Sequence, residues 1–391
     1  MFSLVCLFVI IYAAKLGVLR HPAFILNYVF AVFIVLFSFS EVLFFNEQTF
    51  YINSDEVWFA NEAKLSLLEI WAKHTRYFLY IAYSHTTYLL TGEWGFKLQS
   101  VPFALLIALI LYDGVKKIEI LWLFPFFLGY IFFISTLNMR DTMVICIMLF
   151  YMLKISTANV KWLLVLSLVV ANLCLYIRPE YFYVCFLLMF WVLISRTVRG
   201  GLFVLCVIPS FFIIFSYIYI GDLVFSIAKI IYPVRIDSYL NETAVEITNV
   251  PFMNSNAASI VRQLLTPLPS SKINYFLTQG LSQNLFLLEF FRIIMMTSYY
   301  IMALMLMYKW RSTYAVMRDN IFLHAIFIMA VINTLLYAIY RDGGGASRNK
   351  LYPIILVLCL FVSVYKIKTK SIQKNIVVRE EIINTAGTAN A

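Results

Sequence analysis

The sequence has few charged residues for its length. Only 13% of its 391 residues are Asp, Glu, Lys or Arg, whereas 63% are hydrophobic and the mean hydropathy is +0.87. A water-soluble globule carries roughly twice that charged fraction. The composition therefore excludes a soluble globular protein and predicts a polytopic membrane protein.

Several functional motifs are also missing. There is no GxGxxG fingerprint, and the glycine run Gly343–Gly345 lacks the GK[ST] ending of a phosphate-binding loop, which argues against nucleotide binding. The six cysteines lie in apolar runs without CxxC spacing, so neither a disulfide framework nor a zinc site is indicated. The middles of the apolar runs lack Asp, Glu, Lys and Arg, whereas an ion-coupled transporter usually keeps an ionisable residue there.

Long apolar runs make up most of the chain. A helix needs about 20 apolar residues to cross the hydrocarbon layer, somewhat fewer if protein covers its ends. The sequence predicts an all-α protein with about eleven membrane-spanning helices, at residues 2–19, 22–45, 96–113, 118–137, 141–155, 160–177, 181–195, 202–220, 286–308, 320–340 and 351–366. Residues 1–366 then form one transmembrane domain with two large loops, 46–95 and 221–285, and residues 367–391 form a polar tail that we expect to be disordered.

Positive charge indicates the orientation of these runs. Lysine and arginine gather in alternate connections, at Arg20, Lys116, Lys117, Lys154, Lys161, Arg196, Arg199, Lys309, Arg311, Arg318 and in the tail. The positive-inside rule makes this face cytoplasmic, so the net charge of +10 follows from topology and needs no nucleic-acid partner. Loop 46–95 is then wholly outside, and its Tyr-rich stretch Arg76–Leu90 is expected to be an interfacial helix on the bilayer surface.

The opposite face carries paired charges close to the predicted helix ends. Asp55 and Glu56 follow the second apolar run, and two tight turns hold an arginine beside a carboxylate. Further basic residues lie in the later outer loops. The outer-face candidates are therefore Asp55, Glu56, Arg140, Asp141, Arg178, Glu180, Arg262, Arg348 and Lys350.

The layout resembles the integral-membrane glycosyltransferases of the GT-C superfamily. The resemblance lies in the acidic pair Asp55–Glu56 with Trp58–Phe59 after it, Leu137–Thr142, an Arg-Pro at Arg178, and Arg348 before Tyr352–Ile354. It implies an enzyme that uses polyprenyl-phosphate- or pyrophosphate-linked sugars on the extracytoplasmic side, with a first-loop carboxylate as base or metal ligand. The extra span 2–19 and the long loop 221–285 are instead similar to O-antigen repeat-unit polymerases.

Glycosyl transfer from a lipid pyrophosphate explains the residue types. A carboxylate can accept the proton of the acceptor hydroxyl, and arginine forks can hold the leaving phosphate. We assign Asp55 as the base and Glu56 as its helper or a metal ligand, with His74 and His85 as rival bases. The expected phosphate-binding residues are Arg140, Arg178, Arg348, Lys350 and Arg262, with Asp141 and Glu180 orienting the neighbouring arginines.

These assignments predict a multi-pass protein of the bacterial inner membrane, active on its periplasmic face in surface polysaccharide assembly. Its partners are the bilayer, a polyprenyl-linked glycan donor and a glycan acceptor. No cofactor is required, although Mg²⁺ or Mn²⁺ could bind the acidic pair. A lipid-linked glycan flippase and a non-catalytic assembly subunit remain alternatives of another class.

Overall fold

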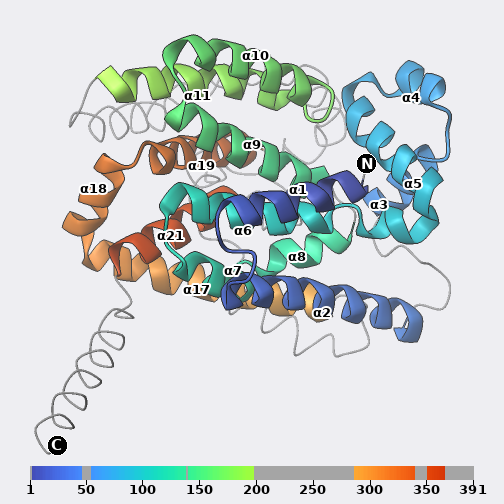
Figure 1. Cartoon of the computed structure of the whole chain (residues 1–391), viewed down its shortest axis with the longest axis horizontal. Helices are drawn as coiled ribbons and strands as arrows, with labels where there is room; N and C mark the ends of the chain where they lie inside the picture. Colours follow the sequence, from blue (N-terminus) through green and yellow to red (C-terminus); the bar gives the residue numbers. More distant parts are fainter. Residues whose placement is uncertain (1, 46–53, 138–139, 198–285, 340–349, 366–391) are drawn as a thin grey trace, which may run out of the picture.

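The computed structural model describes residues 2–45, 54–137, 140–197, 286–339 and 350–365, and its regular structure there is entirely helical (Figure 1). The helices are, in chain order, α1 (Phe2–Lys15), α2 (Pro22–Phe45), α3 (Ser54–Glu62), α4 (Leu67–Lys73), the 3-10 helix η1 (Thr75–Tyr77), α5 (Phe78–Leu98), α6 (Val101–Val115), α7 (Glu119–Phe127), α8 (Gly129–Thr136), α9 (Arg140–Thr157), α10 (Val160–Leu175), α11 (Glu180–Thr197), α17 (Phe286–Tyr308), α18 (Trp310–Asp319), α19 (Ile321–Ile339) and α21 (Leu351–Val364). The all-helical expectation is confirmed for these residues.

Three helices form the centre of the bundle. All residues of α8 are buried, as are residues 102–111 of α6 and most of α21. Side chains that are buried on every face of a helix show that other helices surround it. Consistent with that position, α21 contacts α6, α7, α17, α18 and α19.

The surrounding helices leave large apolar side chains exposed. These residues lie on the outer faces of α1, α2, α10, α11 and α17 and include Leu4, Leu7, Ile11, Val29, Phe33, Leu36, Trp162, Val165, Leu168, Leu187, Phe190 and Leu304. Soluble monomers rarely expose large contiguous apolar patches.

Length distinguishes these helices from the predicted spans. Within the described residues, only Phe290–Tyr308 is by itself long and apolar enough to cross a membrane, and three bent helix pairs raise that number to at most four. The count of about eleven is therefore not reproduced. The predicted span 118–137 is divided between α7 and α8, which meet at 58°, and the apolar helices α1, α10, α11 and α21 have only 14 to 18 residues. The predicted span 202–220 lies outside the described residues.

The first large loop folds as helices at one end of the bundle. In Figure 1, α3, α4 and α5 lie together at one end of the long axis, and α18 lies at the other end. The stretch predicted to be interfacial, Arg76–Leu90, largely coincides with the first part of α5. That helix buries Tyr80, Tyr83 and Ser84 on one side, whereas Leu89 and Leu90 are exposed. It bends by 59° into α6.

Close packing between α6 and α19 depends on Gly114. A Cβ at this position would overlap the ring of Phe322, which is buried at the start of α19. We predict that Gly114→Ala lowers the melting temperature of the detergent-purified protein, because overpacking of this kind costs about 1–3 kcal/mol. Phe322→Leu in the same chain should restore part of the loss. An unchanged melting temperature in the single variant would contradict this packing.

Candidate functional site

The candidate site lies where the start of α9 meets the turn between α10 and α11. The first-loop helices pack against that turn: the backbone N–H of Leu79 donates to the carbonyl of Tyr176 at 3.2 Å, and the rings of Trp71 and Tyr176 are 5.9 Å apart. Arg140 begins α9, and Arg178 lies in the turn. Two of the predicted arginines are thus brought to the same end of the bundle as α3.

Arg140 is held mainly by an aromatic ring. Its guanidinium carbon lies 4.2 Å from the centre of the Tyr77 ring, close enough for a cation–π contact. Its Nη1 donates a long hydrogen bond of 3.5 Å to the carbonyl of Ile177. A guanidinium has five N–H donors. Within the described residues, most of this group's capacity to bind an oxyanion is therefore unused.

Arg178, in the turn between α10 and α11, forms an ion pair with Asp141 in the first turn of α9. The side chains of Arg178 and Asp141 are only 10% and 15% exposed. The guanidinium of Arg178 also lies 5.5 Å from the ring of Tyr181, whose hydroxyl donates to Asn333 at 3.1 Å. Asp141 was expected to orient its neighbour Arg140, and the structure instead pairs it with Arg178. The reason is that consecutive residues on a helix point in different directions.

The acidic pair lies in the first turn of α3. The structure describes only the backbone of Asp55 and Glu56, and α3 begins one residue before them. One turn later, the ring of Trp58 packs against His74 at 5.2 Å and Tyr77 at 6.0 Å. Trp58 of α3 thus contacts Tyr77, and Tyr77 in turn contacts Arg140.

A histidine–carboxylate pair joins the end of α3 to the residue after α4. His74 Nε2 lies 2.7 Å from Glu62 Oε2, and both side chains are about one-fifth exposed, at 19% and 20%. The other loop histidine, His85, instead lies 2.9 Å from the backbone carbonyl of Ala63. Sequence reasoning missed Glu62 because the loop turns between it and His74, and no periodicity relates the two positions.

Lys350 is buried at the N-terminal end of α21. It is 3% exposed, and its Nζ has no hydrogen-bond partner in the part of the chain that the structure describes. Burial lowers the pKa of this lysine from 10.5 to about 7. The structure gives no contact between Lys350 and Arg140 or Arg178, so these three residues are not shown to form one site.

The remaining predicted residues are placed only in part. Glu180 begins α11, and its side chain is not described. Arg262 and Arg348 lie outside the described residues, as do the loop 221–285 and the tail 367–391. No group of three or more His, Cys, Asp and Glu side chains able to hold a metal occurs among the described residues.

The geometry suits recognition of an anion at a helix-end cluster. Arg140 and the Arg178–Asp141 pair together carry one net positive charge, and the ring of Tyr77 bounds the cluster on one side. Guanidinium groups pair with phosphate or carboxylate oxygens through parallel N–H donors. Tyr77, Tyr181 and Asn333 complete the surroundings, and sequence reasoning did not select them for the site.

We predict that the Arg178–Asp141 pair stabilises the fold through mutual neutralisation. Asp141→Asn leaves a nearly buried cation without its counter-ion, and removing one partner of such a pair costs about 3–5 kcal/mol. Asp141→Asn combined with Arg178→Gln should be more abundant in membranes than either single variant, because neither charge is then left unpaired.

The matched control is Lys64 with Glu93, a pair 3.7 Å apart whose side chains are both 46% exposed. Lys64→Gln and Glu93→Gln should change the abundance little, because exposed pairs contribute about 0–1 kcal/mol. A double Asp141/Arg178 variant no more abundant than the worse single variant would contradict the pairing.

A second prediction concerns the pH dependence caused by Lys350. Its pKa in the folded protein is about 7, below the ordinary 10.5, so the unfolded chain binds more protons between these values. Stability should therefore rise as the pH increases from 7 towards 10. Melting temperatures at pH 6.5 and 9.0 should show a smaller rise for Lys350→Met than for wild type. Lys73→Met, at an exposed position on α4, should keep the wild-type rise.

Comparison of the chain with family models, with curated proteins and with solved structures finds no match.

Proposed function

We propose that this chain is an integral-membrane glycosyltransferase that takes a sugar or oligosaccharide from a polyprenyl-(pyro)phosphate on the extracytoplasmic face. The observation that carries the proposal is the convergence of Arg140 and the Arg178–Asp141 pair with helix α3, which bears Asp55 and Glu56. A group that can accept a proton and cations that can hold a leaving phosphate are then found at one end of the bundle.

The membrane part of the proposal is supported by the outer surface. Large apolar side chains are exposed along α1, α2, α10, α11 and α17, and lipid would cover them. In this proposal the short helices cross the bilayer as parts of the bundle, and other parts of the protein cover the ends of each short helix. We propose a multi-pass protein of the bacterial inner membrane, with α3 to α5 and Arg140 facing the periplasm.

The proposed donor site uses Arg140 and Arg178. As the bond to the sugar breaks, negative charge develops on the departing phosphate, and fixed cations stabilise that charge without reorganising. Arg140 can contribute its unused N–H donors, while the Arg178 guanidinium is oriented by Asp141. Mg²⁺ or Mn²⁺ is not required by this scheme.

The proposed base is Asp55, and His74 is its rival on the same loop. Deprotonation of the acceptor hydroxyl raises its nucleophilicity. His74 merits the comparison because Glu62, 2.7 Å from its Nε2, would orient its ring. His85 instead contacts the backbone carbonyl of Ala63, and no carboxylate among the described residues pairs with it.

Two related roles fit the same site. A repeat-unit polymerase would use the same donor chemistry and the same face, with a glycan chain as one substrate. A lipid-linked glycan flippase would also bind the phosphate, but it would need no base. The fate of the lipid-linked substrate distinguishes these classes.

We predict that Asp55→Asn lowers glycan product by about 10²- to 10⁴-fold without lowering the amount of protein in the membrane, because it removes proton acceptance but keeps the side-chain size. Arg140→Ala should also abolish most product, and Arg140→Lys should restore part of it, since lysine keeps the charge but loses the planar fork. The measurements are membrane abundance and surface polysaccharide in cells that carry each variant as their only copy.

His74→Gln and His85→Gln are the matched comparison for the base. Loss of product in His74→Gln together with normal product in Asp55→Asn would transfer the role of base to His74. If neither variant reduces product, the enzymatic proposal fails. In a transferase variant, lipid-linked donor should accumulate on the outer leaflet, whereas in a flippase variant it would accumulate on the inner leaflet.

A further inference from the structure

At the end of the bundle opposite the candidate site, α18 runs across the other helices (Figure 1). We propose that α18 is a membrane-surface helix whose exposed arginines bind the headgroups of anionic phospholipids. The inference rests on the membrane placement proposed above and is independent of glycosyl transfer.

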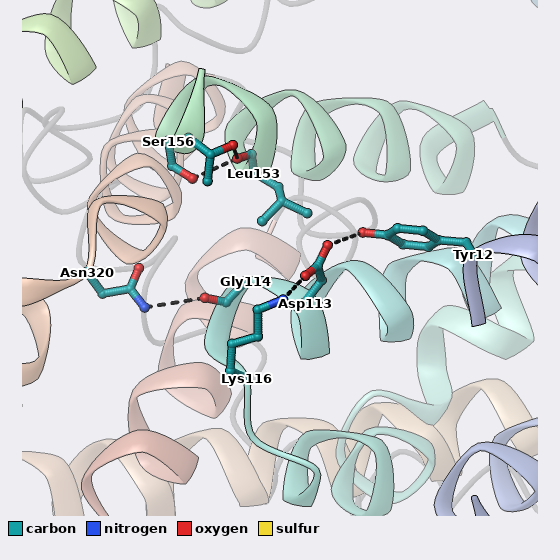
Figure 2. Close-up of polar contacts among 8 residues, drawn as sticks. Tyr12, Asp113, Gly114, Lys116, Leu153, Ser156 and Asn320 are labelled. Atoms are coloured by element: carbon teal, nitrogen blue, oxygen red, sulfur yellow. Dashed lines mark hydrogen bonds and ion pairs between the residues drawn. The ribbon is translucent and has the colours of Figure 1, made fainter. Parts of the chain in front are cut away.

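The orientation of α18 is set by a sharp corner at Asn320. Helices α18 and α19 meet there at 107°. The side-chain oxygen of Asn320 accepts hydrogen bonds from the backbone N–H groups of Phe322 and Leu323 at 3.0 and 3.3 Å, which satisfies two donors at the start of α19. Its amide nitrogen donates to the carbonyl of Gly114 at 3.4 Å, as Figure 2 shows. The corner is therefore fastened both to α19 and to the end of α6.

The two sides of α18 differ in chemistry. Met317 is buried and Val316 packs against the core, and α18 contacts α21, α19 and α17. Arg311, Ser312 and Arg318 are exposed. Arg311 and Arg318 are two helical turns apart and so share one side of the helix. A helix that is apolar inward and basic outward is typical of an element at a membrane surface.

The neighbouring end of α17 has the composition of a lipid boundary. Leu304 and Met307 are 66% and 71% exposed, and Tyr308 and Trp310 follow at 86% and 63%. Tyrosine and tryptophan concentrate at the level of lipid headgroups. The guanidinium of Arg311 lies 5.6 Å from the ring of Trp310, so the charge is adjacent to this aromatic boundary.

Charge favours an anionic partner over a zwitterionic one. Lys309 lies 3.9 Å from the ring of Tyr365, and Arg318 contacts Asp319 at 2.9 Å. Among the residues that the structure describes, no carboxylate pairs with Arg311. The hydrogen bond from Asn320 to Gly114 places the end of α6 next to α18, and the exposed Lys116 lies there (Figure 2). Lys116 pairs with Asp113, which also accepts a hydrogen bond from the hydroxyl of Tyr12 on α1. Each surface lysine or arginine contributes about 1 kcal/mol of attraction to an anionic leaflet.

The test titrates detergent-purified full-length protein with phosphatidylglycerol or phosphatidylcholine and follows the melting temperature. We expect stabilisation by phosphatidylglycerol at a lower concentration than by phosphatidylcholine. Arg311→Gln with Arg318→Gln should weaken the apparent affinity for phosphatidylglycerol by about thirtyfold, because two cations are lost. High salt should weaken the wild-type response, because it screens exposed charges.

Two control variants keep the result interpretable. Lys64→Gln with Lys73→Gln removes two exposed cations at the opposite end and should leave the preference unchanged. Arg311→Lys with Arg318→Lys keeps the charge and should retain most of the preference. Equal responses to phosphatidylglycerol in wild type and in the Arg311/Arg318→Gln variant would overturn the proposal, as would no preference in the wild type.

A cysteine experiment separates this inference from the proposed function. An impermeant thiol reagent added from the periplasmic side should label Leu68→Cys, at a residue that is 83% exposed on α4, and should not label Ser312→Cys. Labelling of Ser312→Cys alone would reverse the orientation given under the proposed function, whereas the inference about α18 stands or falls with the lipid titration. The glycan measurements on Asp55→Asn stay interpretable in either case, because they do not depend on α18.

Discussion

The ion pair between Asp141 and Arg178 is the constraint on which the candidate site depends. It ties the first turn of α9 to the turn between α10 and α11, and the first-loop helices pack against that turn through Leu79 and Trp71. A nearly buried carboxylate or guanidinium is costly unless an opposite charge pairs with it. The pairing therefore holds these helix ends together, and Arg140 lies beside Tyr77 at the same end of the bundle.

The two ends of the bundle use charge differently. At the end with α3, Arg178 is largely buried and Arg140 lies against an aromatic ring, an arrangement suited to one bound anion of defined shape. At the end with α18, Arg311 and Arg318 are exposed on one side of a helix, which suits many interchangeable headgroups at a flat surface. Between the ends, α6, α8 and α21 form an apolar centre that separates these two groups of arginines.

Local composition made some features predictable and left others open. Helices were predictable because apolar runs must satisfy their backbone hydrogen bonds internally. The position of Arg140 and Arg178 at helix ends was also predictable, because a charge interrupts an apolar run. The partner of Asp141 was not, since pairing depends on which helices are adjacent. Glu62 could not be predicted as the partner of His74 either, because that pairing also depends on which segments are adjacent.

The sequence by itself determined the helical class of the described residues, the apolar surface and the accumulation of charge at helix ends, because these follow from composition and from local hydrogen bonding. Only the tertiary structure decided that Arg178 pairs with Asp141, that α7 and α8 meet at 58° instead of forming one straight helix, and that α18 turns by 107° from α19. The physical reason is that bends and pairings are selected by contacts between segments distant in the chain, and such contacts leave no periodic signal within either segment.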